Sequence, residues 1–401
     1  MGGFDAGRLD RIAVWMQSYV EQRRFAGCSV LLAQGGKEVC YHQAGLRDVA
    51  AGKPWERDTV ARIYSMTKPV TSLVLMTLAE EGLFHLDAPV SDFLPAFSDM
   101  TCLVPGATRA DQVEPCAPPT LHQLLTHTSG LSYAFNPGPL GKLMAEHKIE
   151  FRASQPGLAP MCDALAALPL AFRPGTRWEY SVGIDVIGRV IEVVTGQTLE
   201  EVFIERVFDP LGMHETRFSV PPAARDRFAA CYTPLAEGGF TVGKAEKGPD
   251  PLRLIDGAEK SPFLSATLMS GGGGLVGTID DYLKFTEMLR TGGAGIIGPM
   301  TLEFMMRNHL PGEIASMGPQ SFAEQPMEGM GFGIGGAVLL NPGRARSPGS
   351  VGDFSWGGMA STFFWVDPVL ELSAIFFTQL VPSSSYPARP QLKALVHGAM
   401  T

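Results

Sequence analysis

A helix that is apolar on almost every side is predicted directly after Ser65-Met66-Thr67-Lys68. Residues 70–79 contain only aliphatic, Met, Ser and Thr side chains, and Gly82 follows as a residue type that commonly ends helices. Pro69 lies early enough in this helix to be tolerated. Because such a helix has no polar face to expose, we expect it to be buried in the centre of the fold.

Ser65 and Lys68 are candidate catalytic residues. Their spacing puts both side chains on one face of the predicted helix. A lysine at the start of a buried helix has to be paired or to titrate at a lowered pKa, because an ammonium out of water is costly. A serine beside such a lysine can become a nucleophile without a histidine. The motif S-x-x-K is short and weak alone, but its position before a buried helix favours acyl transfer through an acyl-serine.

Strand-like segments are concentrated at the two ends of the chain. Residues 28–33 and 37–42 flank Gln34-Gly35-Gly36 and predict a β-hairpin, and residues 361–366 and 370–380 predict two further strands. Two strands alone would be marginally stable. We therefore expect one antiparallel sheet built from the N- and C-terminal strands, with the first helix and a last helix near residues 391–399 packed on one face.

The predicted fold class is α+β, a single catalytic unit over residues 1–401. Its sheet lobe is expected to comprise residues 1–58 and 325–401, with a mainly helical lobe of residues 59–324 inserted between them. Helices are predicted at residues 121–125, 182–195, 199–207 and 280–289. Residues 101–119 are predicted to be a loop, and residues 238–250 and 308–325 to be mobile loops over a pocket.

Composition and charge narrow the choice of partners. The 401 residues carry a formal charge of -9 without a block of like charge, so neither nucleic acid nor a membrane surface is expected to bind. The N-terminal residues have an amphipathic pattern in place of a signal peptide, and no stretch is long enough to span a membrane. The six scattered cysteines indicate reduced thiols in a cytoplasmic protein, although Cys28 and Cys40 could face each other across the hairpin.

Tyr180 is the candidate general base. It lies in Trp178-Glu179-Tyr180-Ser181, directly before the helix predicted at residues 182–195. If Tyr180 lay beside Lys68, the ammonium would favour the phenolate and lower the pKa of the tyrosine.

A third group, Trp356-Gly357-Gly358, precedes the strand predicted at residues 361–366, on the expected edge of the sheet. Glycines there let a substrate approach the backbone closely. The N–H groups of Met359 and Ser65 are the candidate oxyanion hole, since an edge strand offers unpaired N–H groups.

In this order, the three groups resemble those of serine hydrolases related to class C β-lactamases and penicillin-binding proteins, and most closely the family VIII carboxylesterases. The resemblance implies a β-lactamase-like fold in which Ser65 is the nucleophile, Lys68 its helper, Tyr180 the base and Trp356-Gly357-Gly358 part of the substrate site. It implies no metal or organic cofactor. Further similar segments bring its extent to roughly Phe25–Gln379: Leu124–Leu131, Pro174-Gly175-Thr176, Ile191–Gly196 and Gly272-Gly273-Gly274-Leu275.

Two departures from the β-lactamase pattern bear on the substrate. The chain has Tyr180-Ser181-Val182 where a β-lactamase has Tyr-x-Asn, and Trp356-Gly357-Gly358 where a β-lactamase has Lys-Thr-Gly. The missing asparagine and lysine normally hold the amide and carboxylate of the antibiotic, so an anionic lactam loses its polar contacts. A tryptophan favours apolar or aromatic groups instead.

The resemblance thus predicts a serine carboxylesterase acting on small-molecule esters with short acyl chains or aromatic groups. An acyltransferase of the same fold is an alternative, because fungal acyltransferases are similar over Leu124–Tyr133. Weak β-lactamase or D-amino-acid peptidase activity, or an acylated sensor without turnover, are further alternatives. The sequence leaves open the natural substrate, assembly into homo-oligomers, and whether Lys68 or Tyr180 is the acylation base.

Three other patterns carry less weight. The glycines at residues 272–277 and 331–336 match the dinucleotide-binding expression, but neither lies in a βαβ pattern. No G-x-S-x-G motif surrounds any serine, which argues against an α/β-hydrolase. His127 is interpreted as a helix-capping residue and not as a catalytic base.

Overall fold

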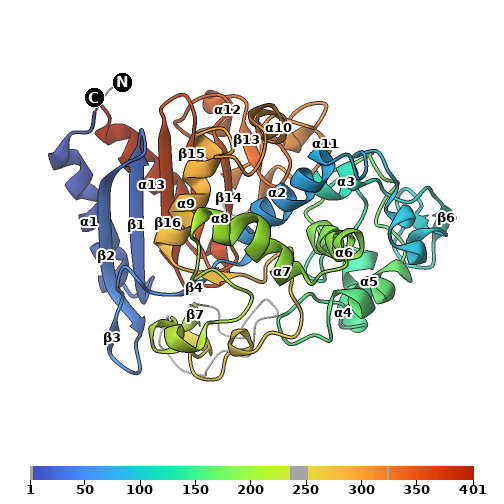
Figure 1. The fold of residues 1–401 in the computed structure, drawn as a ribbon, viewed down its shortest axis with the longest axis horizontal. Coiled ribbons are helices and arrows are strands. Elements are labelled where there is room, and N and C mark those ends of the chain that lie inside the picture. Colours follow the sequence, from blue (N-terminus) through green and yellow to red (C-terminus); the bar gives the residue numbers. More distant parts are fainter. Residues whose placement is uncertain (1–2, 235–251, 323–324) are drawn as a thin grey trace.

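An eight-stranded sheet joins the two ends of the chain in this computed structural model, which describes residues 3–234, 252–322 and 325–401. All of its neighbouring strands are antiparallel. In spatial order the strands are β12 (Met330–Phe332), β13 (Ala337–Leu339), β14 (Phe354–Gly357), β15 (Phe363–Asp367), β16 (Leu372–Thr378), β1 (Gly27–Gln34), β2 (Lys37–Asp48) and β3 (Lys53–Pro54). Figure 1 shows the two termini side by side. The prediction of one antiparallel sheet from both ends is confirmed.

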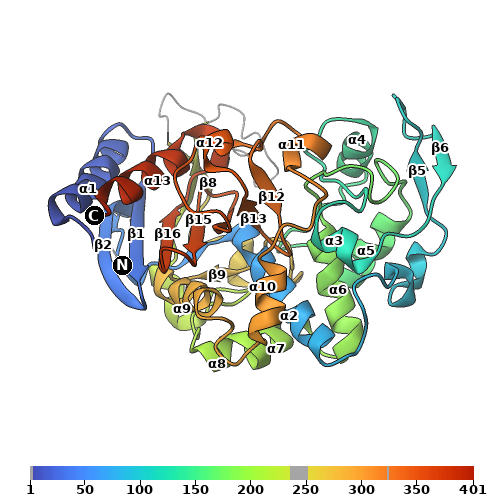
Figure 2. The same cartoon turned by 90° about the horizontal axis from the view of Figure 1, so that it is seen from above.

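Alternating side chains give the sheet two buried faces, as the two-residue period of a strand requires. On β15, Phe363 and Trp365 pack in the cluster that includes residues of α1 (Ala6–Glu21) and α13 (Ala388–Ala399). Phe364 belongs to the opposite cluster, where it contacts Tyr282 of α9 (Ile279–Arg290) at 5.2 Å between ring centroids. The first and last helices therefore share one face of the sheet, as predicted, and α9 covers the other (Figure 2).

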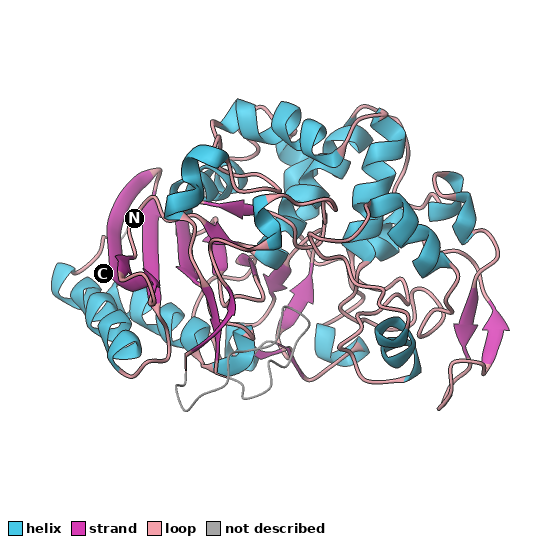
Figure 3. Cartoon of the chain, turned by 90° about the horizontal axis from the view of Figure 1, so that it is seen from below, coloured by secondary structure: helices cyan, strands magenta, loops and turns pink. Residues whose placement is uncertain are grey.

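Short helices joined by long loops lie beside the sheet (Figures 1 and 3). These are α2 (Thr67–Glu80), α3 (Leu121–Leu125), α4 (Pro139–Glu146), α5 (Leu158–Ala166), α6 (Gly183–Thr195), α7 (Leu199–Phe203), α8 (Asp209–Leu211), α10 (Pro299–Met305), α11 (Ile314–Met317) and α12 (Pro342–Ala345). Helix α2 is buried from Thr67 to Leu78 and packs against α6 and α7, which confirms the predicted central helix. The lobe boundaries at residues 58/59 and 324/325 stay a prediction.

Four two-stranded ribbons complete the described structure. They are β4 (Ala61–Arg62) with β9 (Val276–Gly277), β5 (Thr101–Leu103) with β6 (Val113–Pro115), β7 (Cys231–Thr233) with β8 (Arg253–Asp256), and β10 (Ser321–Phe322) with β11 (Gln325–Pro326). Ribbon β5–β6 lies in the segment predicted as a plain loop, so that prediction is wrong. Its backbone pairs across the turn and also with Leu170, which the sequence pattern of a polar loop does not reveal.

Several local predictions are corrected. The helix predicted at residues 199–207 changes at Ile204–Phe208 into a wider π-helical turn. Cys28 pairs with Ala44 and Cys40 with Leu32, so the hairpin register keeps the two thiols apart, and all six cysteines are free. The loop predicted at residues 308–325 contains α11 and β10. The loop predicted at residues 238–250 lies outside the described residues. Among the described residues, no helix has the length and apolarity that a membrane span requires.

Candidate active site

Ser65 is held in a tight turn immediately before α2. The turn Tyr64–Met66 is a 3-10 helix, so Ser65 lies directly ahead of α2, whereas Lys68 lies within α2. Tyr64 has a φ of 42°, a left-handed conformation that costs a non-glycine residue about 1 kcal/mol. The Tyr282 hydroxyl donates to the Met66 carbonyl at 2.9 Å and fixes the turn against α9. Ser65 thus lies at the N-terminus of the most deeply buried helix.

Lys68 is fully buried, and its Nζ has three oxygen partners. Nζ lies 2.6 Å from the Gly272 carbonyl oxygen, 2.9 Å from the Tyr133 hydroxyl and 3.3 Å from Ser65 Oγ. It also lies 4.6 Å from the centroid of the Tyr180 ring. Since an ammonium has three N–H donors, these three oxygens match its full hydrogen-bonding capacity.

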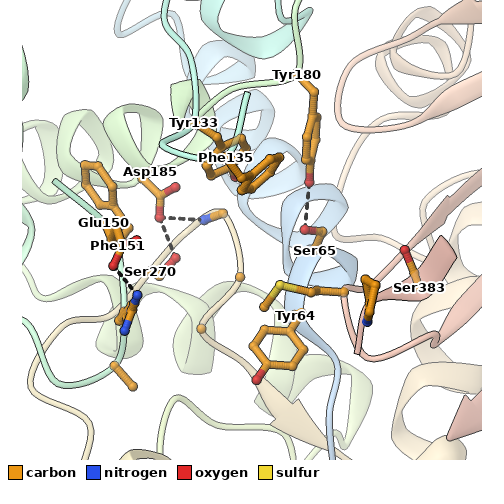
Figure 4. A pocket seen from close by; sticks show the side chains of 18 of the residues that line it. Tyr64, Ser65, Tyr133, Phe135, Glu150, Phe151, Tyr180, Asp185, Ser270 and Ser383 are labelled. Carbon is orange, nitrogen blue, oxygen red and sulfur yellow. Dashed lines mark hydrogen bonds and ion pairs between the residues drawn. The ribbon is translucent and has the colours of Figure 1, made fainter. Parts of the chain in front are cut away.

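Tyr180 reaches Ser65 from the segment before α6. Its hydroxyl oxygen lies 2.7 Å from Ser65 Oγ (Figure 4). Because Lys68 Nζ lies 3.3 Å from the same oxygen, Ser65 contacts both candidate bases. The Asn136 side chain donates to the Tyr180 carbonyl at 2.9 Å and fixes this segment. The three residues chosen from the sequence, Ser65, Lys68 and Tyr180, are therefore brought together.

The second tyrosine, Tyr133, differs from Tyr180 in its contacts. Its hydroxyl is hydrogen-bonded to Lys68, and its ring stacks on Phe135 at 4.8 Å between centroids. Burial raises the pKa of Tyr133 well above its ordinary value, with further contributions from Tyr180 and Asp185. Tyr133 is consequently a neutral phenol that orients Lys68.

Trp356-Gly357-Gly358 runs along the other side of Ser65's pocket, at the end of β14. The strand predicted at the sheet edge, residues 361–366, corresponds to β15. It pairs with both β14 and β16, so the prediction of an edge strand is wrong. The first two residues of β14 pair with β13 as well. Trp356 and Gly357 pair only with β15 in the described structure. A Cβ on Gly358 would stand 2.3 Å from the Ile63 carbonyl oxygen, so this glycine allows close packing against the segment that leads to Ser65. This close packing is a second reason for a glycine at position 358, in addition to the predicted close approach of the substrate to the backbone.

A cavity of about 460 Å³ opens above Ser65. Its lining is mainly apolar, and Met359 lies in the wall next to Gly358. The aromatic lining residues are Tyr64, Tyr133, Phe135, Phe151, Tyr180, Phe263, Phe322 and Trp356. A volume of this size suits a small organic molecule.

Comparison with known proteins places this site in a family. The beta-lactamase family model matches residues 12–398. The chain belongs to the beta-lactamase family. This family member is 34% identical over 392 residues to esterase EstB of Burkholderia gladioli, covering 93% of this chain and 90% of EstB. It is 26% identical over 356 residues to monacolin J acid methylbutanoyltransferase of Aspergillus terreus, covering 86% of this chain and 82% of that enzyme.

The fold of this chain is similar to that of a solved structure over nearly the whole length of both chains. EstCE1, described as a hydrolase with promiscuous acyltransferase activity, matches this beta-lactamase family chain with a TM-score of 0.80 and 30% identity, covering 98% of each chain. The resemblance to serine hydrolases of this type and the predicted fold class are thereby confirmed.

His127 has a role in this beta-lactamase family site that the sequence interpretation missed. It does not cap a helix, because Thr120 caps the start of α3 and Thr126 follows its end. His127 is buried with a φ of 57°, and its Nδ1 lies 3.2 Å from Ser181 Oγ. Burial, and then the charge of Lys68, lower the pKa of His127 well below its ordinary value. A neutral imidazole therefore packs against the ring of Tyr180 in an edge contact, at 4.8 Å between centroids.

Sequence reasoning also missed Asp185 and the use of Gly272. The glycine run 271–274 forms the loop beside Lys68 and not a dinucleotide-binding turn. Asp185 lies in the first turn of α6, among apolar residues that gave no sign of a site. The only available signal was a carboxylate within a helix face that is otherwise apolar.

Proposed function

We propose that this protein is a serine carboxylesterase that hydrolyses esters through an acyl-enzyme on Ser65. The observation that carries the proposal is the position of Ser65 Oγ, 2.7 Å from the Tyr180 hydroxyl and 3.3 Å from Lys68 Nζ, at the base of a mainly apolar cavity. Similarity to esterase EstB supports the same activity. A nucleophile needs an adjacent base, and both candidate bases are in reach.

In the acylation step, Lys68 and Tyr180 together accept the proton of Ser65. The serine oxygen attacks the ester carbonyl carbon and forms a tetrahedral intermediate. The backbone N–H groups of Ser65 and Met359 are the proposed donors to its oxyanion. The intermediate collapses to the acyl-serine, and the alcohol leaves with the proton that the pair returns.

Water completes the reaction. The Lys68 and Tyr180 pair takes a proton from a water molecule, whose oxygen attacks the acyl carbon. The second tetrahedral intermediate then releases the carboxylic acid, and Ser65 regains its proton. Two easier steps thereby replace one difficult hydrolysis.

The substrate class follows from the lining of the cavity. Trp356 and Phe322 stack with an interplanar angle of 12° and form a flat aromatic wall. With Gly357 and Gly358 beside it, this wall is the proposed contact for a short acyl chain or an aromatic group. The proposed partner is a small-molecule ester, while assembly into homo-oligomers and a cytoplasmic location stay predictions.

The proposal is tested by stopped-flow hydrolysis of p-nitrophenyl acetate and butyrate, with intact-protein mass after quenching. Wild type is expected to show a burst, steady turnover and one acyl adduct. Ser65→Ala is expected to show none of them. Ester hydrolysis by Ser65→Ala above the background rate would overturn the mechanism, and an adduct without turnover would indicate a sensor.

A transfer activity is the second candidate function. EstCE1 is described as having promiscuous acyltransferase activity, and the apolar cavity offers contacts to an alcohol as well as to an acyl group. In that case an alcohol replaces water in the second step. Product analysis with added alcohols separates the two outcomes by the ratio of new ester to free acid. Turnover of nitrocefin at rates close to those of esters would instead favour a β-lactamase.

A further inference from the structure

Asp185 is a buried carboxylate next to the site that the reaction steps above do not use. Its side chain projects from α6 and is 1% exposed. Its Oδ1 atom accepts two hydrogen bonds (Figure 4). One comes from Ser270 Oγ at 2.5 Å, and the other comes from the Gly272 N–H at 3.0 Å. Both donors belong to the loop that precedes β9. Asp185 therefore ties this loop to α6.

The same glycine contacts Lys68. The Gly272 N–H points to Asp185, and the Gly272 carbonyl oxygen lies 2.6 Å from Lys68 Nζ. One residue thus separates a buried carboxylate from a buried amine. A Cβ at this position would stand 2.3 Å from Asp185 Oδ2, so only glycine fits between the two groups.

The loop is anchored on both sides of Gly272. The Thr71 hydroxyl donates to the Gly271 carbonyl at 2.6 Å, and the Leu275 N–H donates to the Thr67 hydroxyl oxygen at 3.1 Å. Both threonines belong to α2, the helix of Lys68. Asp185 supplies the remaining restraint, which comes from α6 and sets the orientation of the Gly272 backbone.

The charge of Lys68 gives a second reason for a carboxylate at position 185. The three oxygens around Lys68 Nζ come from neutral groups, and an ammonium in a buried site needs a compensating charge. The other buried or half-buried acids of the cavity wall are already paired, Glu150 with Arg152 and Asp256 with Arg62. Asp185 makes no direct ion pair within the described structure. Burial raises the pKa of Asp185, and the charge of Lys68 acts in the opposite direction.

We propose that Asp185 is the positioning residue of Lys68, because it holds the Gly272 carbonyl against Nζ and supplies the negative charge that balances the ammonium. This inference rests on the proposed function. Asp185 acts through Lys68 and does not touch the reacting ester.

The proposal has a consequence for the pH profile. The titratable groups around Asp185 are Lys68 on α2, Tyr133 in the loop after α3, and Cys162 on α5. Lys68 in turn faces Tyr180 and the neutral His127. Without the carboxylate, the ammonium is less stabilised and loses its proton at lower pH. The limb of the kcat/KM profile that reports the Lys68 and Tyr180 pair is expected to move to lower pH by about one unit.

The experiment separates the effect of the Asp185 charge from the effect of the side-chain shape. Asp185→Asn keeps the shape and removes the charge, whereas Asp185→Glu keeps the charge and changes the shape. Ser270→Ala is the matched control, because it removes one hydrogen bond to Asp185 and no charge. The kcat/KM profile for p-nitrophenyl butyrate is measured from pH 5 to pH 10 for each folded variant, as judged by circular dichroism. Asp185→Ser serves as the neutral variant if Asp185→Asn does not fold.

The expected result is that the limb follows the charge. The limb of the kcat/KM profile moves to lower pH in the neutral variant, Asp185→Asn or Asp185→Ser. It stays at the wild-type pH in Asp185→Glu and Ser270→Ala, whatever the maximal rates of these variants. A neutral variant with reduced activity and an unmoved limb would overturn the proposal and leave a purely structural role. An active Ser65→Ala enzyme would instead overturn the proposed function, so the two failures are distinguishable.

Discussion

Two cations are buried within a few residues of Ser65, and their surroundings differ. Arg62 on β4 donates from Nε to Asp256 at 2.7 Å, and its Nη1 donates to the Ala229 carbonyl at 2.6 Å. Lys68 on α2 contacts only neutral oxygens, with Asp185 one residue removed. Both side chains are fully buried. The comparison teaches that two buried cations can be held in different ways: Arg62 by a direct ion pair, and Lys68 by neutral oxygens with a carboxylate one residue removed.

Lys68→Met gives the largest expected effect. Removing the amine should lower kcat/KM for p-nitrophenyl butyrate by on the order of 10³–10⁴-fold, because the proton of Ser65 loses its acceptor pair. The fold should persist, since a methionine of similar volume replaces a buried charge. Circular dichroism melts check the fold. Near-normal activity in the folded variant would show that Lys68 is structural, like Arg62.

Arg62→Met tests the other member of the comparison. It leaves the Asp256 carboxylate, whose side chain is 8% exposed, without its ion-pair partner. A broken buried pair costs about 3–5 kcal/mol, so the free energy of unfolding should fall by that amount. Urea titration measures it. The folded fraction should keep its kcat, and a specific loss of kcat without loss of stability would contradict the distinction drawn between the two cations.

Tyr180 and Tyr133 both lie beside Lys68, and their variants separate the tyrosine that contacts Ser65 from the one that contacts only Lys68. Tyr180→Phe removes the hydroxyl that contacts Ser65 and should lower kcat by about 10²–10⁴-fold with little change in KM. Tyr133→Phe removes one acceptor of Lys68 and should lower kcat by about 10–100-fold, because a hydrogen bond to a charged group contributes about 1.5–3 kcal/mol. Steady-state kinetics at pH 8 measure both. Equal losses would mean that Tyr133 shares the role of the base.

The smallest effect concerns the pH dependence of stability. The lowered pKa of His127 means that the folded state binds fewer protons than the unfolded state below about pH 6.5, so stability is lost as the pH falls through that value. Lys68 contributes to the lowering, after burial. His127→Gln should lose less unfolding free energy than wild type between pH 7 and pH 5, because it lacks the group that gains a proton on unfolding. Urea titrations at both pH values measure the difference, and an equal or larger loss would contradict it.

The parts of the site predicted from the sequence all rest on local patterns. Ser65 and Lys68 were found because one turn of helix brings them together, and Tyr180 because it directly precedes a recognisable helix that ends at Gly196, with its φ of 71°. The sheet was predicted because apolar alternation marks its strands at both ends of the chain. The resemblance to a known family then supplied the roles.

The parts that were missed depend on contacts between distant segments. Gly272 meets Lys68 across 204 residues, and its own segment reads only as a glycine-rich turn. Asp185 looks like an isolated acid on a buried helix until the loop around Gly272 folds onto it. The strand predicted at residues 361–366 was placed at the sheet edge because β14, which pairs with it, was not predicted as a strand.

The sequence by itself determined the buried helix and the serine and lysine at its start, because periodicity and spacing act over a few residues, and its resemblance to a known family supplied their roles. Only the tertiary structure decided which carbonyl holds Lys68 and which carboxylate lies behind that carbonyl. These choices depend on how four separate segments pack around one buried amine, and the cost of leaving that amine without partners is paid only once the fold is complete.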